Sequence, residues 1–184
     1  MTLVFSLSYD FNLLVSHDPR SYYLARQEIF RILEECGDDN PKISRTIAKG
    51  VTGVKTSLNN REVIALLKEK FASQRNIFRF TAKWTPIDLW CDASNLEPLK
   101  RALSSLTDKI LPGEKWMMHV EKRRYVTHHK AEIIKELASA IQEKVDLRNP
   151  DKIVWIEIVG KQAGISIITP SEVFSLYRAM IANS

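Results

Sequence analysis

The sequence has few of the residues from which metal and redox sites are usually built. It contains only two cysteines, Cys36 and Cys91, which lie far apart and form no C-x-x-C motif. These are too few ligands for a structural zinc site. One disulfide is compatible with this count, but two free thiols in a reducing compartment are favoured. The sequence therefore predicts a cytoplasmic protein that binds no metal.

Motifs of nucleotide binding and hydrolysis are also missing. No G-x-x-x-x-G-K-[ST], G-x-G-x-x-G, G-x-S-x-G or H-E-x-x-H pattern occurs. The adjacent His128 and His129 would diverge by about 100° on a helix, so they would not share a metal ion. His17 and His119 are isolated in the sequence. We therefore expect no cofactor and no catalysis by this chain alone, with acid–base chemistry at His128 or His129 as the alternative.

Long apolar runs are absent as well, because charged residues interrupt every such run. No segment is predicted to cross a membrane. The N-terminal stretch MTLVFSLSYDF is apolar, but it has neither a basic segment before it nor a small-residue cleavage site. It is predicted to lead into a strand and not to act as a signal peptide.

The composition that remains is that of a globular protein with a basic excess. Of 184 residues, 45% are hydrophobic and 27% are charged, which suits one domain or two small ones. The net charge of +5 and the pI near 9.2 mildly indicate a polyanionic partner.

The first 84 residues follow a β-α-β-β-α-β order. Asn59 or Asn60 can cap the second helix, and Lys49-Gly50 can turn the central hairpin. This order is typical of ferredoxin-like folds, which many unrelated functions share. Residues 1–84 are therefore predicted to form an N-terminal ferredoxin-like domain. Its predicted elements are strand 11–16, helix 21–37, the hairpin within 42–58, helix 59–74 and strand 77–84.

A second set of helices and strands follows residues 85–98, whose prolines and turn residues indicate a linker. Helix 129–145 is the most regular, with Ile134, Leu137, Ala138, Ile141 and Val145 at helical spacing. The whole chain is thus predicted to be α/β (α+β), with a second domain over residues 85–184. The predicted elements of that domain are helix 96–111, strand 113–125, helix 129–145 and strands 152–160 and 164–177.

The stretch VEKRRYVTHHKAEII, residues 120–134, concentrates basic residues between a strand and a helix. Lys122, Arg123 and Arg124 stand where the strand ends, so at least two of them should face solvent. Thr127 is the predicted helix cap, and the free N–H groups of a helix start favour phosphate. A solvated loop is the alternative interpretation.

The turn between the last two strands has a similar character. Lys161 and Gln162 stand at this turn, and the small Ala163 and Gly164 would let a sugar–phosphate backbone approach closely. A simple hairpin turn is an equally good interpretation of the local sequence.

The second half resembles the THUMP domain, an RNA-binding module of tRNA-modifying enzymes. The resemblance rests on three motifs: V-D-L-R-N-P-D at 145–151, V-W-I-E-I at 154–158 and G-I-S-I at 164–167. It covers roughly residues 85–175, and in this family a ferredoxin-like domain commonly comes first. Because the sequence ends soon after the pattern, we expect no catalytic domain. The chain then resembles stand-alone THUMP proteins, adaptors that assist N4-acetylation of cytidine in tRNA by a separate acetyltransferase.

The resemblance implies that the chain holds the acceptor stem and 3′ end of tRNA. Predicted phosphate contacts are Lys122, Arg123, Arg124, Lys130, Lys161 and Arg148, with Tyr125 or His128 stacking on a base. Thr127, Gln162 and Gly164 complete the predicted tRNA-binding set. Arg45, Lys49 and Lys55 could extend it, or could belong to a solvated hairpin. Alternative functions are a tRNA-binding subunit for thiolation or methylation, and a small RNA-processing enzyme using His128 or His129.

Overall fold

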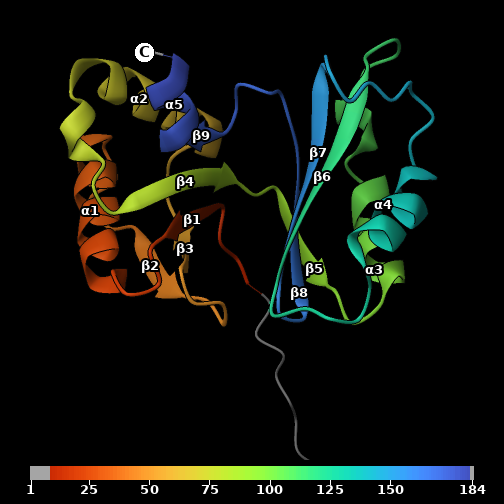
Figure 1. Ribbon diagram of the computed structural model, residues 1–184, viewed down its shortest axis with the longest axis horizontal. Coiled ribbons are helices and arrows are strands. Elements are labelled where there is room, and N and C mark those ends of the chain that lie inside the picture. The colour runs from red at the N-terminus through yellow and green to blue at the C-terminus, as the bar shows by residue number, and fades with distance from the viewer. Residues whose placement is uncertain (1–8, 183–184) are drawn as a thin grey trace, which may run out of the picture.

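The computed structural model describes residues 9–182 and contains two β-sheets that face each other (Figure 1). Helices cover the outer side of each sheet, so the layers run helix, sheet, sheet, helix. Most of the N-terminal stretch predicted to lead into the first strand, residues 1–8, lies outside the described residues. No helix within 9–182 is both long and apolar enough to cross a lipid bilayer.

The first sheet confirms the ferredoxin-like prediction. Its strands run in the order β2-β3-β1-β4, and each neighbouring pair is antiparallel. The two helices bury Ile29, Ile32 and Leu67 against Leu13 and Trp84 of the sheet. The elements are β1 (Leu13–His17), α1 (Tyr22–Glu35), β2 (Lys42–Arg45), β3 (Val51–Lys55), α2 (Asn60–Ser73) and β4 (Thr81–Pro86), with a short 3-10 turn at Arg75–Ile77 before β4.

Two local predictions in this half are confirmed. The Asn59 side chain caps α2 by accepting hydrogen bonds from the N–H groups of Arg61 and Glu62, at 2.9 and 3.3 Å. Gly50 has a φ of +81°, a conformation that a turn between β2 and β3 requires and that glycine adopts without strain.

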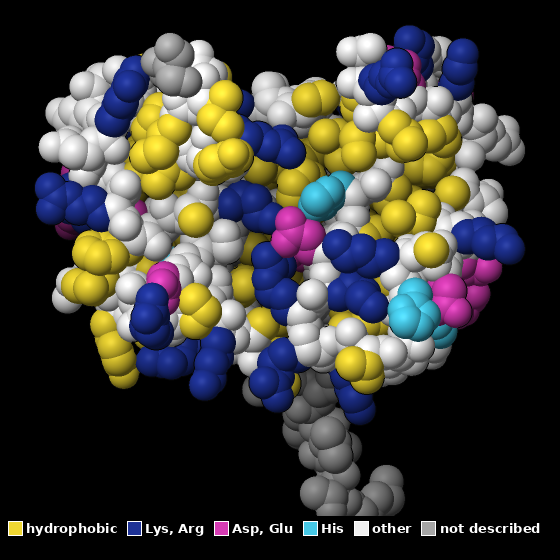
Figure 2. Space-filling view, in the orientation of Figure 1, with side chains coloured by type: hydrophobic (Ala, Val, Ile, Leu, Met, Phe, Trp, Pro, Cys, Tyr) yellow, Lys and Arg dark blue, Asp and Glu magenta, His cyan; other side chains and the backbone are white. Residues whose placement is uncertain are grey.

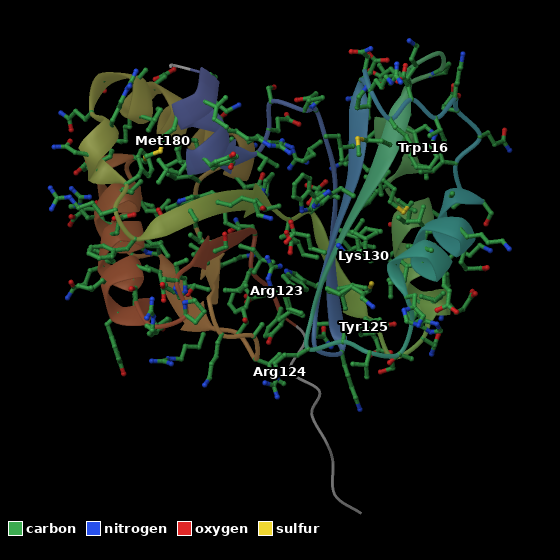
Figure 3. The ribbon with its side chains drawn as sticks, viewed as in Figure 1. Trp116, Arg123, Arg124, Tyr125, Lys130 and Met180 are labelled. Carbon is green, nitrogen blue, oxygen red and sulfur yellow. The ribbon has the colours of Figure 1, made fainter. Side chains whose placement is uncertain are left out.

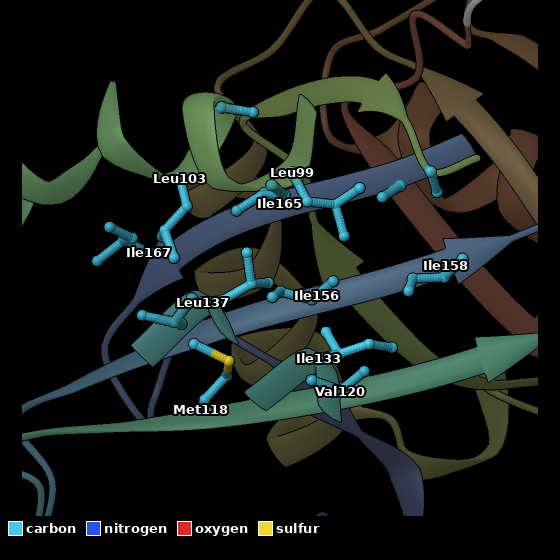
Figure 4. Packing of buried hydrophobic residues seen from close by; sticks show 14 of the residues in the cluster. Leu99, Leu103, Met118, Val120, Ile133, Leu137, Ile156, Ile158, Ile165 and Ile167 are labelled. Atoms are coloured by element: carbon cyan, nitrogen blue, oxygen red, sulfur yellow. The ribbon is translucent and has the colours of Figure 1, made fainter. Parts of the chain in front are cut away.

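The second sheet has the order β5-β8-β7-β6, in which β6 and β7 are parallel and the other pairs antiparallel. Helices α3 and α4 cover one face, where Leu99, Leu103 and Leu137 pack on Ile156 and Ile165 (Figure 4). The elements are β5 (Leu89–Asp92), α3 (Leu96–Ser104), β6 (Trp116–Arg123), α4 (Lys130–Ala138), β7 (Lys152–Val159) and β8 (Gln162–Ile168), with a short 3-10 turn at Thr107–Lys109.

Several predicted boundaries in this half were wrong. Helix α3 ends at Ser104 and not at Leu111. The linker predicted at 85–98 contains β5, a strand of the second sheet. Helix α4 ends at Ala138 and not at Val145, because the backbone near Val145 pairs with β6 instead: Trp116 N–H donates to the Lys144 carbonyl at 3.0 Å. The strand predicted over 164–177 stops at Ile168.

The end of the chain returns to the first sheet. Strand β9 (Phe174–Ser175) pairs with β4, and α5 (Leu176–Ala182) follows it. Phe174 is buried among the core residues of the first sheet, with its ring centroid 4.8 Å from that of Phe78. The predicted division into residues 1–84 and 85–184 did not include this return.

A part-buried ion pair joins the two sheets. Arg61 of α2 donates to both oxygens of Asp88, at 2.6 and 3.0 Å, and also to the carbonyl of Ile167 in β8. Lys109 lies 3.0 Å from the same carboxylate. Burial by itself would raise the pKa of Asp88, but Arg61 and Lys109 hold that pKa below its ordinary value. The two sheets are therefore fixed to each other.

Candidate nucleic-acid interface

Three chain segments meet at the lower end of the second sheet in Figure 1. Strands β6 and β7 end side by side, at Arg123 and Val159, and the turn into β8 follows at Gly160 and Lys161. Gly160 N–H donates to the Arg123 carbonyl at 2.9 Å. The Lys161 carbonyl accepts from Ala93 N–H at 2.8 Å. These bonds hold the exposed Lys161 beside the point where the chain leaves β6.

Arg124 is the residue that turns the chain away from the sheet. Its φ is +53°, and it is the only non-glycine residue with a positive φ among residues 9–182. This left-handed conformation costs an ordinary residue about 1–2 kcal/mol. Its side chain is exposed at the lower edge (Figure 3). Arg124 and Lys161 are therefore neighbouring, solvent-facing cations. At least two of Lys122, Arg123 and Arg124 were predicted to face solvent, and this was wrong because only Arg124 is exposed.

Arg123 points the opposite way, into the space between the sheets (Figure 3). Its guanidinium donates to Glu157 at 2.5 Å and to Glu121 at 2.6 Å. Lys83 of β4 lies 2.5 Å from Glu121 and 3.5 Å from Glu157, which completes the network. Burial would lower the pKa of Arg123, but the two carboxylates raise it. Arg123 is thus part of the contact between sheets and not of the exposed cationic surface predicted for it.

Two further residues of the predicted set serve the local fold. Tyr125 is only 8% exposed and belongs to the core under α4, so its ring has no free face for a base. Lys122 donates its ammonium to the His128 carbonyl at 2.5 Å and lies 5.6 Å from the Tyr125 ring centroid. The predicted stacking by Tyr125 was wrong because the side chain fills the core.

The start of α4 also differs from the prediction. The cap is His129 and not Thr127, and the His129 N–H donates to the Glu132 carboxylate at 2.7 Å. Glu132 stands three residues after the cap, where a capping box places an acidic side chain. Thr127 and Lys130 are exposed, and His128 is half-buried, 3.9 Å from Glu132. The carboxylate of Glu132 therefore already interacts with the helix start that was predicted to receive phosphate.

The remaining predicted residues do not join this surface. Arg148 is exposed near the first residue of β6, since Asp146 N–H bonds to the Trp116 carbonyl, so it lies at the far end of the strand. Gln162 begins β8 and is half-buried. Gly164 is buried, and a Cβ there would lie 3.0 Å from Ile87 and 3.2 Å from Trp90. Its small size serves packing between the sheets and not the approach of RNA.

The β2–β3 hairpin of the first sheet adds two exposed cations to this surface. Ile47, in the loop between β2 and β3, lies against Gly160 of the β7–β8 turn. Arg45 and Lys49 are exposed on this loop's two sides. Lys55 is at the opposite end of the hairpin, paired with Lys42. The contact at Ile47 therefore brings two cations of the first half next to two of the second.

We call Arg45, Lys49, Arg124 and Lys161 the basic edge. Figure 2 shows Lys and Arg side chains gathered along the lower edge of both halves. Within residues 9–182, no carboxylate forms an ion pair with any of these four residues. Asp92 is an exposed acid at the same end, opposite Gln162 in the β5–β8 pair. Uncompensated cations on a fixed surface suit a phosphodiester backbone.

Lys83 and Glu157 were missed by the sequence reasoning, although part of the signal was present. Glu121 and Arg123 are two residues apart on a strand, which places them on one face. Glu157 stands in register with Glu121 in the parallel pair. Lys83, in contrast, comes from the other half of the chain, and no sequence pattern indicated that it pairs with these two glutamates. Among the described residues, no group of three or more His, Cys, Asp or Glu side chains could hold a metal ion.

Residues 93–168 match the family model described as the THUMP domain. The chain contains a THUMP domain. This domain is an RNA-binding module of tRNA modification, and here it comprises α3, β6, α4, β7 and β8. The matched range includes Arg124 and Lys161, so half of the basic edge belongs to it. No curated protein matches the sequence.

Three solved structures share the fold. The protein PH1313 of Pyrococcus horikoshii superposes with a TM-score of 0.63 at 16% identity, over 89% of this chain and 54% of that one. TrmN of Thermus thermophilus gives 0.58 at 15% identity, over 84% and 44%. A 4-thiouridine synthetase in complex with RNA and ATP gives 0.56 at 15% identity, over 90% and 42%. This chain thus spans about half the length of these proteins, and the likeness covers both sheets.

Proposed function

We propose that the chain is a non-catalytic tRNA-binding adaptor. It holds the acceptor stem and 3′ end of tRNA and presents the tRNA to a separate acetyltransferase, which forms N4-acetylcytidine. The observation that carries the RNA-binding part is the basic edge, four unpaired cations contributed by both halves of the molecule. The acetylation part is supported by the resemblance of the sequence to stand-alone THUMP proteins.

The fixed junction between the sheets suits a positioning role. Asp88 is held by Arg61 and Lys109, and the Lys83 network bridges the sheets a second time. A tRNA bound along the basic edge would therefore meet one rigid surface and not two independent modules. A rigid surface fixes the direction in which the rest of the tRNA projects, which is what an enzyme acting at a distant nucleotide requires.

The RNA-binding part is tested by titrating tRNA against the purified chain at several salt concentrations. Each phosphate neutralised on single-stranded RNA contributes about 0.7 to the slope of log K against log salt, and duplex contacts contribute slightly more. Four cations thus predict a slope of about −3. Binding that does not depend on salt would contradict the assignment of the basic edge.

The acetylation part needs a cellular experiment. The gene is deleted, and nucleosides from total tRNA are quantified by mass spectrometry. Loss of N4-acetylcytidine, restored by the wild-type chain, supports the proposal. Loss of a thiolated or methylated nucleoside with intact N4-acetylcytidine would identify a different modifying enzyme as the partner. The non-catalytic part fails if the purified chain alone modifies or cleaves tRNA.

A control separates adaptor function from enzyme function in the same strain. His128→Ala with His129→Ala removes both candidate acid–base groups and leaves the basic edge intact. The adaptor hypothesis expects this variant to restore the nucleoside. Failure to restore it, with normal tRNA binding, would favour a catalytic role for the histidines.

A further inference from the structure

A hollow of about 250 Å³ lies between the start of α1 and the β2–β3 loop, next to the basic edge. Tyr22, Arg45 and Lys49 line it, with His17 at its floor. Both ring nitrogens of His17 are already used, by the Thr52 hydroxyl at 2.9 Å and the Asp18 carbonyl at 2.8 Å. The histidine therefore shapes the floor, and the groups available to a ligand are the aromatic and cationic ones.

The aromatic and cationic groups form a stack. The Arg45 guanidinium carbon lies 3.9 Å from the Tyr22 ring centroid and 5.2 Å from that of Tyr23. The two rings are 5.3 Å apart and nearly perpendicular. Tyr23 is 72% exposed. One face of the guanidinium thus covers Tyr22, while Arg45 and the Tyr23 ring remain exposed.

The charges around the hollow favour an anion. Asp18, which follows His17 in the chain, is paired with Arg20 at 3.0 Å, and the first turn of α1 carries no acidic residue. Within residues 9–182, neither Arg45 nor Lys49 has a carboxylate partner. Lys49 also stands beside Gly50 and one residue after Ala48, in the loop that touches the β7–β8 turn through Ile47. A single RNA strand that follows the basic edge from Lys161 would therefore reach this hollow next.

We propose that this hollow binds one unpaired nucleotide of the RNA. The base stacks on the Arg45 guanidinium and against Tyr23, which stands beside the hollow and not in its lining, and Lys49 neutralises the adjoining phosphate. Arginine planes and tyrosine rings are the surfaces on which proteins stack splayed-out RNA bases, whereas a base inside a duplex is inaccessible to them. This proposal rests on the proposed function and adds that the ferredoxin-like half selects single-stranded RNA.

The test compares two RNA stem-loops of the same stem, one with a short single-stranded 3′ overhang and one with a blunt end. Wild-type protein is expected to bind the overhang more tightly. Tyr23→Leu and Arg45→Lys should each weaken binding of the overhang RNA about tenfold and leave the blunt RNA nearly unchanged. Arg45→Lys keeps the charge and removes only the planar surface. Tyr23→Phe keeps the ring and should bind as wild type.

Tyr177→Leu is the matched control, because Tyr177 is 73% exposed on α5, away from the hollow. It should leave both affinities unchanged. Thermal melting of each variant verifies that the fold is intact. If the Tyr22–Arg45 contact serves only the fold, the variants will lower the melting temperature without changing the preference for the overhang, and the proposal is overturned.

Crosslinking gives an independent readout. An overhang carrying 4-thiouridine is irradiated with the protein, and crosslinked peptides are identified by mass spectrometry. Crosslinks are expected on the tryptic peptide SYYLAR, residues 21–26. Equal loss of blunt and overhang binding in the variants, or crosslinks confined to other peptides, would overturn the site while leaving tRNA binding in place. Failure of the wild-type protein to bind either RNA would instead overturn the proposed function, and this site with it.

Discussion

Two adjacent arginines, Arg123 and Arg124, should respond to mutation in opposite ways. They are neighbours in sequence, but Arg124 is exposed at the basic edge, whereas Arg123 lies between the sheets in ion pairs with Glu121 and Glu157. We therefore expect Arg124 to contribute to RNA binding and Arg123 to stability. The variants Arg124→Gly and Arg123→Met separate the two contributions.

Arg124→Gly removes one cation and also relieves a backbone strain. A φ of +53° costs an arginine about 1–2 kcal/mol relative to glycine, although glycine loses part of this through its more flexible unfolded state. The free energy of unfolding should therefore stay constant or rise by up to about 1 kcal/mol. The affinity for tRNA should fall, and the salt slope should decrease by about 0.7–0.9, the contribution of one phosphate.

Arg123→Met leaves the buried Glu157, which is 1% exposed, with Lys83 as its remaining charged partner. Removing one member of a buried ion pair typically costs about 3–5 kcal/mol. Because Lys83 still compensates part of the charge, we expect about 2–3 kcal/mol here. The salt slope of tRNA binding should remain that of the wild type, since this side chain does not reach the basic edge.

The assays are urea denaturation followed by tryptophan fluorescence, and filter binding of tRNA over a range of salt concentrations. Arg61→Lys, at the other junction contact, serves as a control for destabilisation without loss of an edge cation. The assignment is refuted if Arg123→Met flattens the salt slope while its stability is unchanged. It is equally refuted if Arg124→Gly binds tRNA with the wild-type slope.

Three further predictions concern the scaffold. The hydrogen bond with His119 and the charges of Lys83 and Arg123 hold the pKa of Glu121 well below its ordinary value. The ionised Glu121 therefore stabilises the fold above about pH 4.3, and this contribution is lost as the pH falls through the folded pKa. Glu121→Gln should lower the free energy of unfolding at pH 7, and its difference from wild type should shrink in urea melts at acid pH. Gly164→Ala should cost about 1–3 kcal/mol in urea melts, because the new methyl group would lie 3.0 Å from Ile87, and an equal stability would contradict the packing. Asn59→Ala should cost about 1 kcal/mol through loss of the α2 cap, while Asn59→Asp, which keeps the acceptor, should not.

The fold of the first half could be predicted because its signals are local. The cap at Asn59, the turn at Gly50 and the alternation of strand and helix patterns each act within a few residues. The return of β9 and α5 to the first sheet could not be predicted in this way. Phe174 packs against residues more than ninety positions earlier, such as Phe71 and Phe78, and a two-residue strand has no periodicity of its own.

The length of α4 shows how a local signal can be overridden. The apolar spacing of Ile141 and Val145 continues a helical pattern, but the carbonyls of Glu143 and Lys144 accept hydrogen bonds from the indole and backbone N–H of Trp116. Those bonds, together with the pairing of Val145 with β6, replace the helical ones. A pattern in one segment cannot show that another segment competes for the same backbone groups.

The predicted RNA-binding residues also differ in whether local sequence or distant residues decide their orientation. Two members of the predicted set, Arg124 and Lys161, are exposed at the basic edge, and their contact with RNA stays a prediction. Residue type alone did not separate cations that face solvent from those engaged in the protein. The direction of each side chain depends on strand alternation and on acids in other strands, which decided the orientation of Arg123.

Net charge is therefore a weak guide to this surface, and the position of compensating acids is a stronger one. In the stretch 122–130, Lys122 bonds to a carbonyl and Arg123 to two carboxylates, so only part of the local positive charge faces outward. The hairpin loop of the first half, which sequence alone left undecided, supplies Arg45 and Lys49 without acidic partners. The contact of Ile47 with Gly160 is what makes these four cations one surface. The basic edge thus belongs to the junction of the two halves and not to the THUMP domain alone.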